Sequence, residues 1–145
     1  MRPFKALIVE DFADFRRFLH LTLQENAECQ IIGEASDGLQ AVQQADELQP
    51  DLILLDIGLP ALNGIEVARR IRKLSPNSKI LFVTQESSVE AIQEAFRLGA
   101  CGYLLKLDAA ELLLAVDAVL QGTRFVSSHL KHHRSPIESS ELPMF

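Results

Sequence analysis

The chain has 145 residues, 48% of them hydrophobic, and a formal net charge of −6. This length is typical of one domain, and the apolar content is enough for a core, which excludes global disorder. The acidic balance argues against direct DNA binding by this chain, because domains that bind duplex DNA are usually basic. The two cysteines indicate no disulfide framework and no apolar run is long enough to cross a membrane, so we expect a cytoplasmic protein without a membrane segment.

Five short apolar runs recur along the chain and are rich in Ile, Leu and Val. Their apolar residues are continuous rather than alternating, which indicates strands of a parallel sheet that is covered on both faces. The predicted strands are residues 4–9, 30–35, 51–55, 79–83 and 101–105.

The stretches between these runs carry apolar residues at helical spacing, beginning with Phe15 and Leu19. Turn and capping residues agree with this pattern. Asp37 precedes the second predicted helix, and Asp108 with Glu111 forms a capping pattern for the fifth. The alternation is (βα)5 and predicts an α/β fold, a flavodoxin-like, doubly wound sheet of five parallel strands in the order 2-1-3-4-5.

The last part of the chain differs in composition from the rest. The residues after Gly122 are polar and contain several serines and histidines. We therefore predict one domain over residues 1–122 and a polar tail or linker over residues 123–145.

Acidic residues follow two of the predicted strands. Glu10 and Asp11 end the first strand and Asp56 ends the third. These strands are neighbours in the predicted order, so the three carboxylates meet in the crevice at the C-terminal ends of the strands. Two unit charges about 4 Å apart repel by about 4 kcal/mol at an effective dielectric near ~20, so the cluster needs a counterion. Carboxylate ligands at a partly solvated site suit Mg²⁺.

Two further strand ends supply groups that complement this cluster. Thr84 follows the fourth strand and Lys106 follows the fifth. A metal, a carboxylate nucleophile, a hydroxyl donor and an ammonium group together fit a phosphoryl group in transfer. The loop after the first strand is acidic and lacks a glycine-rich motif, which excludes a flavin or dinucleotide phosphate site.

Each of these residues also has an ordinary interpretation. Asp11 or Asp14 would serve as the N-cap of the first helix, Thr84 is a common strand residue, and Lys106 would be a solvated surface lysine. All of these interpretations would have to hold together to explain four strand ends with these residue types. The combined pattern therefore favours a phosphoryl site.

At these positions the chain resembles the receiver domain of two-component response regulators, over about residues 3–122. The matching motifs are Glu10-Asp11, LLDIGLPALNG at 54–64, Thr84, and GYLLK at 102–106. Residues 99–106 and 108–113 further resemble the NarL/FixJ-type subfamily.

The resemblance implies a role for each residue of the site. Asp56 would accept a phosphoryl group from a phosphohistidine on a sensor histidine kinase or a phosphotransfer protein. Glu10, Asp11 and Asp56 would hold Mg²⁺ together with the backbone carbonyl of Gly58. Lys106 would pair with Asp56 at rest and with the phosphoryl group after transfer.

The resemblance also implies a switch pair, Thr84 and Tyr103. Phosphoryl oxygens would draw Thr84 inward, and Tyr103 would rotate into the space that Thr84 leaves. The surface formed by the fourth helix, the fifth strand and the fifth helix would then change.

Three residues depart from the usual family pattern. Gln85 stands where a small residue is common, and we expect it to affect donor access and dephosphorylation. Gly58 leaves one wall of the site open to water. Leu107 follows the lysine, where the family often has a proline with a cis peptide bond before it. A non-proline cis bond costs ~2.5–4 kcal/mol, so we expect a trans bond or a rearranged loop here.

The resemblance implies a phosphorylation-activated receiver that regulates transcription through an output domain not in this chain. Two alternatives remain open: a stand-alone receiver that acts by protein contact or phosphorelay, and a degenerate receiver used only for protein interaction. We do not expect an enzyme, because a phosphatase would want a second acid–base carboxylate near Asp56, and Asp56-x-Gly58 lacks it. At most we expect self-phosphorylation from small donors and slow self-dephosphorylation. A homodimer is compatible with the sequence.

Overall fold

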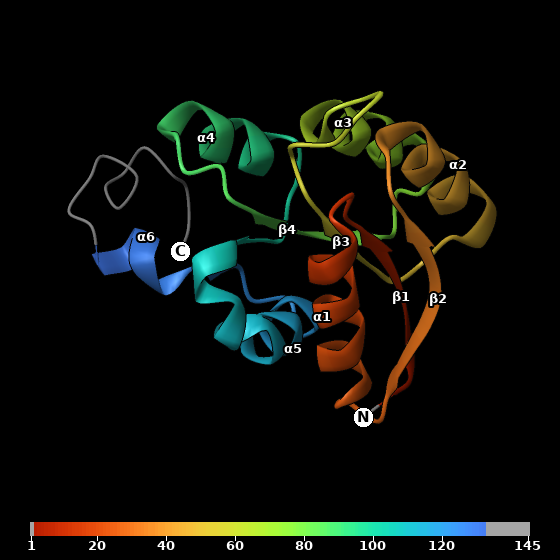
Figure 1. The fold of residues 1–145 in the computed structure, drawn as a ribbon, viewed down its shortest axis with the longest axis horizontal. Helices are drawn as coiled ribbons and strands as arrows, with labels where there is room; N and C mark the ends of the chain where they lie inside the picture. The colour runs from red at the N-terminus through yellow and green to blue at the C-terminus, as the bar shows by residue number, and fades with distance from the viewer. Residues whose placement is uncertain (1, 133–145) are drawn as a thin grey trace.

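The computed structural model describes residues 2–132, which form one sheet with helices on both faces (Figure 1). The strands are β1 (Phe4–Val9), β2 (Cys29–Ala35), β3 (Leu52–Leu55), β4 (Lys79–Thr84), β5 (Gly102–Leu105) and β6 (Phe125–Val126). The helices are α1 (Ala13–Gln24), α2 (Gly38–Leu48), α3 (Gly64–Leu74), α4 (Val89–Arg97), the 3₁₀ helix η1 (Lys106–Glu111), α5 (Leu112–Leu120) and α6 (Ser128–His132). None of these helices is long and apolar enough to span a membrane.

The strands of the described residues lie parallel in the order β2-β1-β3-β4-β5-β6. The predicted fold and the order of the first five strands are confirmed. The predicted number of strands is wrong, because β6 adds a sixth. It comes from residues 123–145, which the sequence assigned to a polar tail, and residues 133–145 lie outside the described part. A strand of two residues is too short to show a hydrophobic period, so composition alone could not reveal it.

The apolar residues run without interruption along each strand because alternate side chains pack into two different cores, one on each face of the sheet. Leu7 and Val9 of β1 pack in the core under α2, α3 and α4, whereas Ala6 and Ile8 pack in the core under α1 and α5 (Figure 1). Burying one such Leu or Ile side chain contributes about 1.5–3 kcal/mol. The two cores hold the strand ends rigidly, and these ends carry the polar residues of the site.

The sequence predicted that Asp108 caps α5, and this prediction is wrong. The Asp108 carboxylate accepts hydrogen bonds from the hydroxyl of Ser127 and from the backbone N–H of His129, at the start of α6, and it also pairs with the His129 ring. Ser127 Oγ in turn accepts from the N–H of Leu105, 3.1 Å away. These distant partners replace the local cap, and η1 occupies the place of the predicted first turn. The peptide bond between Lys106 and Leu107 is trans, as expected.

Candidate functional site

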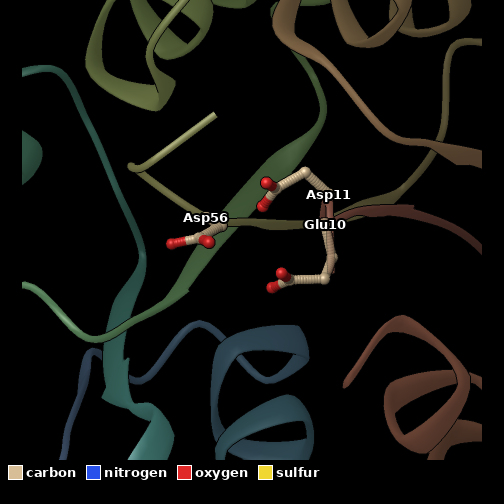
Figure 2. Close-up of side chains that lie close together, drawn as sticks. All are labelled: Glu10, Asp11 and Asp56. Atoms are coloured by element: carbon tan, nitrogen blue, oxygen red, sulfur yellow. The ribbon is translucent and has the colours of Figure 1, made fainter. Parts of the chain in front are cut away.

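The three predicted carboxylates meet at the C-terminal ends of β1 and β3. Glu10, Asp11 and Asp56 each offer an oxygen atom within 4.8 Å of the others, and Figure 2 shows the Glu10 and Asp11 side chains leaving the backbone in opposite directions with their carboxylates turned toward Asp56. The backbone remains paired beyond the strand ends, since Asp56 N donates to the Val9 carbonyl at 3.2 Å. The acidic residues therefore sit on a fixed part of the sheet rather than on a loose loop.

Glu10 is fully buried and its two carboxylate oxygens have different surroundings. Oε2 accepts from Phe12 N at 3.0 Å. Oε1 lies 2.9 Å from Lys106 Nζ, an ion pair by distance, although it falls outside hydrogen-bond geometry. Burial raises the pKa of Glu10, and the neighbouring charge of Asp56 adds to this effect. A buried carboxylate that is paired with one ammonium group and lies beside two other carboxylates is a good ligand for a hard cation such as Mg²⁺.

Asp11 is exposed and has no capping role in the structure. The N-cap of α1 is Phe12, and no side chain makes a capping hydrogen bond there. The ordinary interpretation of Asp11 or Asp14 as the N-cap of this helix is therefore wrong. Asp11 instead completes the carboxylate cluster from its solvent side.

Asp56 is held against the start of α3 by a glycine. A Cβ atom on Gly64 would lie 2.0 Å from the backbone carbonyl oxygen of Asp56, so a larger residue would force these two segments apart. Gly64 follows the N-cap Asn63, whose side chain accepts from the N–H of Glu66 at 3.1 Å. The close approach explains why glycine stands here, and it fixes the backbone of the central carboxylate.

Lys106 lies over the carboxylate pair. Its Nζ is 3.1 Å from Asp56 Oδ2 and 2.9 Å from Glu10 Oε1, and it also lies 4.8 Å from the centre of the Phe15 ring. Burial alone would lower the pKa of Lys106, but the two carboxylates outweigh it and the pKa is raised. The lysine is therefore a fixed positive charge beside Asp56.

Thr84 and Tyr103 are both joined to Glu86. Thr84 Oγ1 accepts from the N–H of Glu86 at 3.3 Å, and the Tyr103 hydroxyl donates to the Glu86 carbonyl at 2.7 Å. The Tyr103 ring is fully buried between Phe82 and Phe96, and burial raises the pKa of its phenol. Tyr103 is therefore an interior side chain in this structure, held to Glu86 through its hydroxyl.

A cavity of about 360 Å³ opens above the carboxylates. Its lining includes Gln85 and six of the predicted site residues: Glu10, Asp11, Asp56, Gly58, Thr84 and Lys106. Tyr103 is absent from this lining and lies behind it. A Cβ atom on Gly58 would meet no atom within 4 Å, in agreement with the open wall expected from the sequence.

Sequence reasoning did not find the roles of two residues in this region, Glu86 and Phe15. Glu86 acts through its backbone groups, which leave no signal in residue type, although its place two residues after Thr84 is a clue. Phe15 shows only helical spacing in the sequence, and its contact with Lys106 joins α1 to the first residue of η1, far away along the chain.

A doubly wound parallel sheet with a carboxylate cluster and a lysine at its C-terminal ends defines the receiver class of signalling domains. Residues 6–117 match the family model of the response regulator receiver domain. The chain belongs to this family, as the sequence predicted.

The curated relatives include transcription regulators. Transcriptional regulatory protein YdfI of Bacillus subtilis is 39% identical over 119 residues, which are 81% of this chain and 55% of that protein. Nitrate/nitrite response regulator protein NarL of Escherichia coli is 32% identical over 129 residues, which are 88% of this chain and 60% of that protein. The chain thus spans little more than half the length of these relatives.

Solved structures agree with the fold. A two-component response regulator of the LuxR family from Aurantimonas is 30% identical with a TM-score of 0.83, and the match covers 88% of this chain and 92% of that one. The receiver domain of a NarL-type regulator from Mycobacterium tuberculosis is 26% identical with a TM-score of 0.78, over 84% of this chain and 99% of that one. The predicted NarL/FixJ-type likeness is confirmed by these relatives.

Proposed function

We propose that this chain is a phosphorylation-activated receiver in which Asp56 accepts a phosphoryl group. The donor is a phosphohistidine on a sensor histidine kinase or a phosphotransfer protein in the cytoplasm. One observation carries the proposal: the Asp56 carboxylate lies in an open cavity, 3.1 Å from the Lys106 ammonium and within 4.8 Å of the carboxylates of Glu10 and Asp11.

The chemistry assigned to Asp56 is a phosphoryl transfer. A carboxylate oxygen of Asp56 attacks phosphorus, the P–N bond of the phosphohistidine breaks, and its electron pair stays with the imidazole nitrogen. Lys106 balances charge on the phosphoryl oxygens. Glu10, Asp11 and Asp56 would hold Mg²⁺ with the backbone carbonyl of Gly58, and the ion would supply charge neutralisation between carboxylate and phosphoryl oxygens.

The contacts of Glu86 offer a route from Asp56 to Tyr103. A phosphoryl oxygen that accepts a hydrogen bond from the Thr84 hydroxyl would draw Oγ1 away from the N–H of Glu86, from which Oγ1 accepts in this structure. The carbonyl of that same residue holds the Tyr103 hydroxyl. Movement of Thr84 would thus change the support of Tyr103. Shifting such a two-state element from 1:99 to 99:1 needs about 5.5 kcal/mol of differential stabilisation.

The output we propose is regulation of transcription through an output domain outside residues 1–145. The names of the curated relatives and the fact that the chain spans little more than half of them support this. A stand-alone receiver in protein contact or phosphorelay is the second candidate, and a degenerate receiver the third. We propose no enzymatic turnover of a foreign substrate, because Gly58 supplies no acid–base carboxylate beside Asp56; self-phosphorylation from small donors and slow self-dephosphorylation are the limit.

The test is intact mass after incubation with acetyl phosphate and Mg²⁺. We expect one phosphoryl adduct, which is lost in Asp56→Asn and when the metal is chelated. Asp14→Asn is the matched control, because Asp14 is an exposed acidic residue of α1 outside the cluster. An adduct that persists in Asp56→Asn would refute the assignment, and no adduct in the unaltered chain would favour the degenerate receiver.

A further inference from the structure

An aromatic ring of α1 lies beside the lysine of the site. Lys106 Nζ is 4.8 Å from the centre of the Phe15 ring, within the range of a cation–π contact. The Phe15 ring is itself stacked on Phe18, with ring centres 5.5 Å apart. The ammonium group therefore has carboxylates on one side and an aromatic face on another.

This arrangement restricts the lysine in a way that the carboxylates alone do not. A lysine side chain is long and flexible, and it loses several rotamers when it is held in place. The Lys106 side chain is only 15% exposed, so the contact with the ring is largely shielded from water, which strengthens a cation–π interaction. The ring also carries no charge, so its attraction for the ammonium does not change when the carboxylates exchange partners.

The constant attraction of the Phe15 ring for the ammonium group matters during phosphoryl transfer. Asp56 becomes a mixed anhydride, and Glu10 and Asp11 would share their charge with Mg²⁺, so the carboxylates would hold Lys106 less strongly than at rest. The Phe15 ring, which lies on α1, keeps its contact with Lys106 through these changes.

We propose that Phe15 is a positioning residue for Lys106, which keeps the ammonium group where it meets the phosphoryl oxygens. This inference rests on the proposed function, and it assigns to an apolar residue a part in the rate of adduct formation. The ring takes no part in bond making or breaking and acts only through the lysine.

The experiment measures the rate constant of adduct formation from acetyl phosphate in the full chain, followed by intact mass. Phe15→Leu keeps an apolar side chain but removes the aromatic face, and we expect the rate constant to fall about three- to thirty-fold, the range from an exposed to a desolvated cation–π contact. Phe15→Tyr retains the ring and should restore a rate close to that of the unaltered chain. A small donor is used so that docking of a kinase on α1 does not enter the comparison.

Phe18→Leu is the matched control, because it makes the same change in the stacked partner, on the same helix. We expect it to leave the rate constant unchanged. Lys106→Ala tests the coupling: in that background Phe15→Leu should have no further effect, since the group that it positions is gone. Thermal unfolding of each variant confirms that the chain remains folded.

Three results would overturn the inference: equal rates in Phe15→Leu and the unaltered chain, equal losses in Phe15→Leu and Phe18→Leu, or an undiminished effect of Phe15→Leu in the Lys106→Ala background. Failure of the proposed function is distinguished from these, because the unaltered chain would then give no Asp56-dependent adduct at all.

Discussion

Gly58 determines how open the site is next to Asp56. Most residues that line the cavity carry polar side chains, but at Gly58 the wall consists of backbone, and an added Cβ atom would meet nothing within 4 Å. If Asp56 is phosphorylated as proposed, a water molecule that hydrolyses the phosphoryl group would approach through this gap.

We expect Gly58→Asn to slow loss of the phosphoryl adduct several-fold, because the amide side chain fills part of this approach. The free energy of unfolding should change by no more than about 0.5 kcal/mol, as for other substitutions that meet no neighbours. The measurement is the first-order decay of the adduct by intact mass after removal of donor. Gly58→Ala adds only the Cβ atom and serves as control. Equal decay in all three chains would show that this opening does not limit hydrolysis.

At the scale of elements, Asp108 joins η1 to the start of α6. Burial alone would raise the pKa of Asp108, but hydrogen bonds from the Ser127 hydroxyl and from His129 outweigh it, and the pKa is lowered. The folded state therefore favours the charged carboxylate. Its contribution to stability is complete above the unfolded pKa near ~4 and is lost as the pH falls through the lower folded value.

We expect Asp108→Asn to reduce the free energy of unfolding by about 1.5–3 kcal/mol at pH 6, the range for hydrogen bonds to a charged group. The difference from the unaltered chain should shrink as the pH is lowered below about 4, where the carboxylate of the unaltered chain takes up its proton. Urea unfolding across this pH range measures it. Asp117→Asn, at a half-buried position of α5 away from Asp108, controls for a general loss of negative charge. A difference that stays constant with pH would contradict this account.

At the scale of the whole molecule, the carboxylate cluster opposes folding through the repulsion of its members. A cation that binds only the folded chain stabilises it by RT ln(1 + [Mg²⁺]/Kd), which is about 1.4 kcal/mol at a concentration ten times Kd. We therefore expect Mg²⁺ to raise the urea midpoint of unfolding. In Glu10→Gln the rise should be smaller, because one ligand has lost its charge, whereas Asp14→Asn should respond like the unaltered chain. Equal responses in all three would place the ion elsewhere.

Much of this molecule could be predicted from sequence, because the strands and the acidic residues of the site are marked by short stretches of neighbouring residues. The strands buried on both faces are continuous apolar runs, and an acidic residue directly after such a run is conspicuous, as at Glu10 and Asp56. The elements that sequence missed depend on distant partners. Asp108 fits a local capping pattern, yet Ser127 and His129 compete for its carboxylate, and no pattern within η1 reveals them. The contact between Phe15 and Lys106 likewise joins segments that only the fold brings together.

The strand β6 has a consequence for how the chain can be shortened. Phe125 and Val126 pair with β5, and Val126 and Leu130 lie in the same core as Tyr103. A chain cut at Gly122, the domain end expected from sequence, would leave β5 as a bare outer strand with unpaired N–H and C=O groups and an uncovered apolar flank. Such strands are templates for pairing between molecules, so the shortened chain would tend to self-associate and aggregate. The short β6 thus covers the edge of β5, the strand that carries Tyr103.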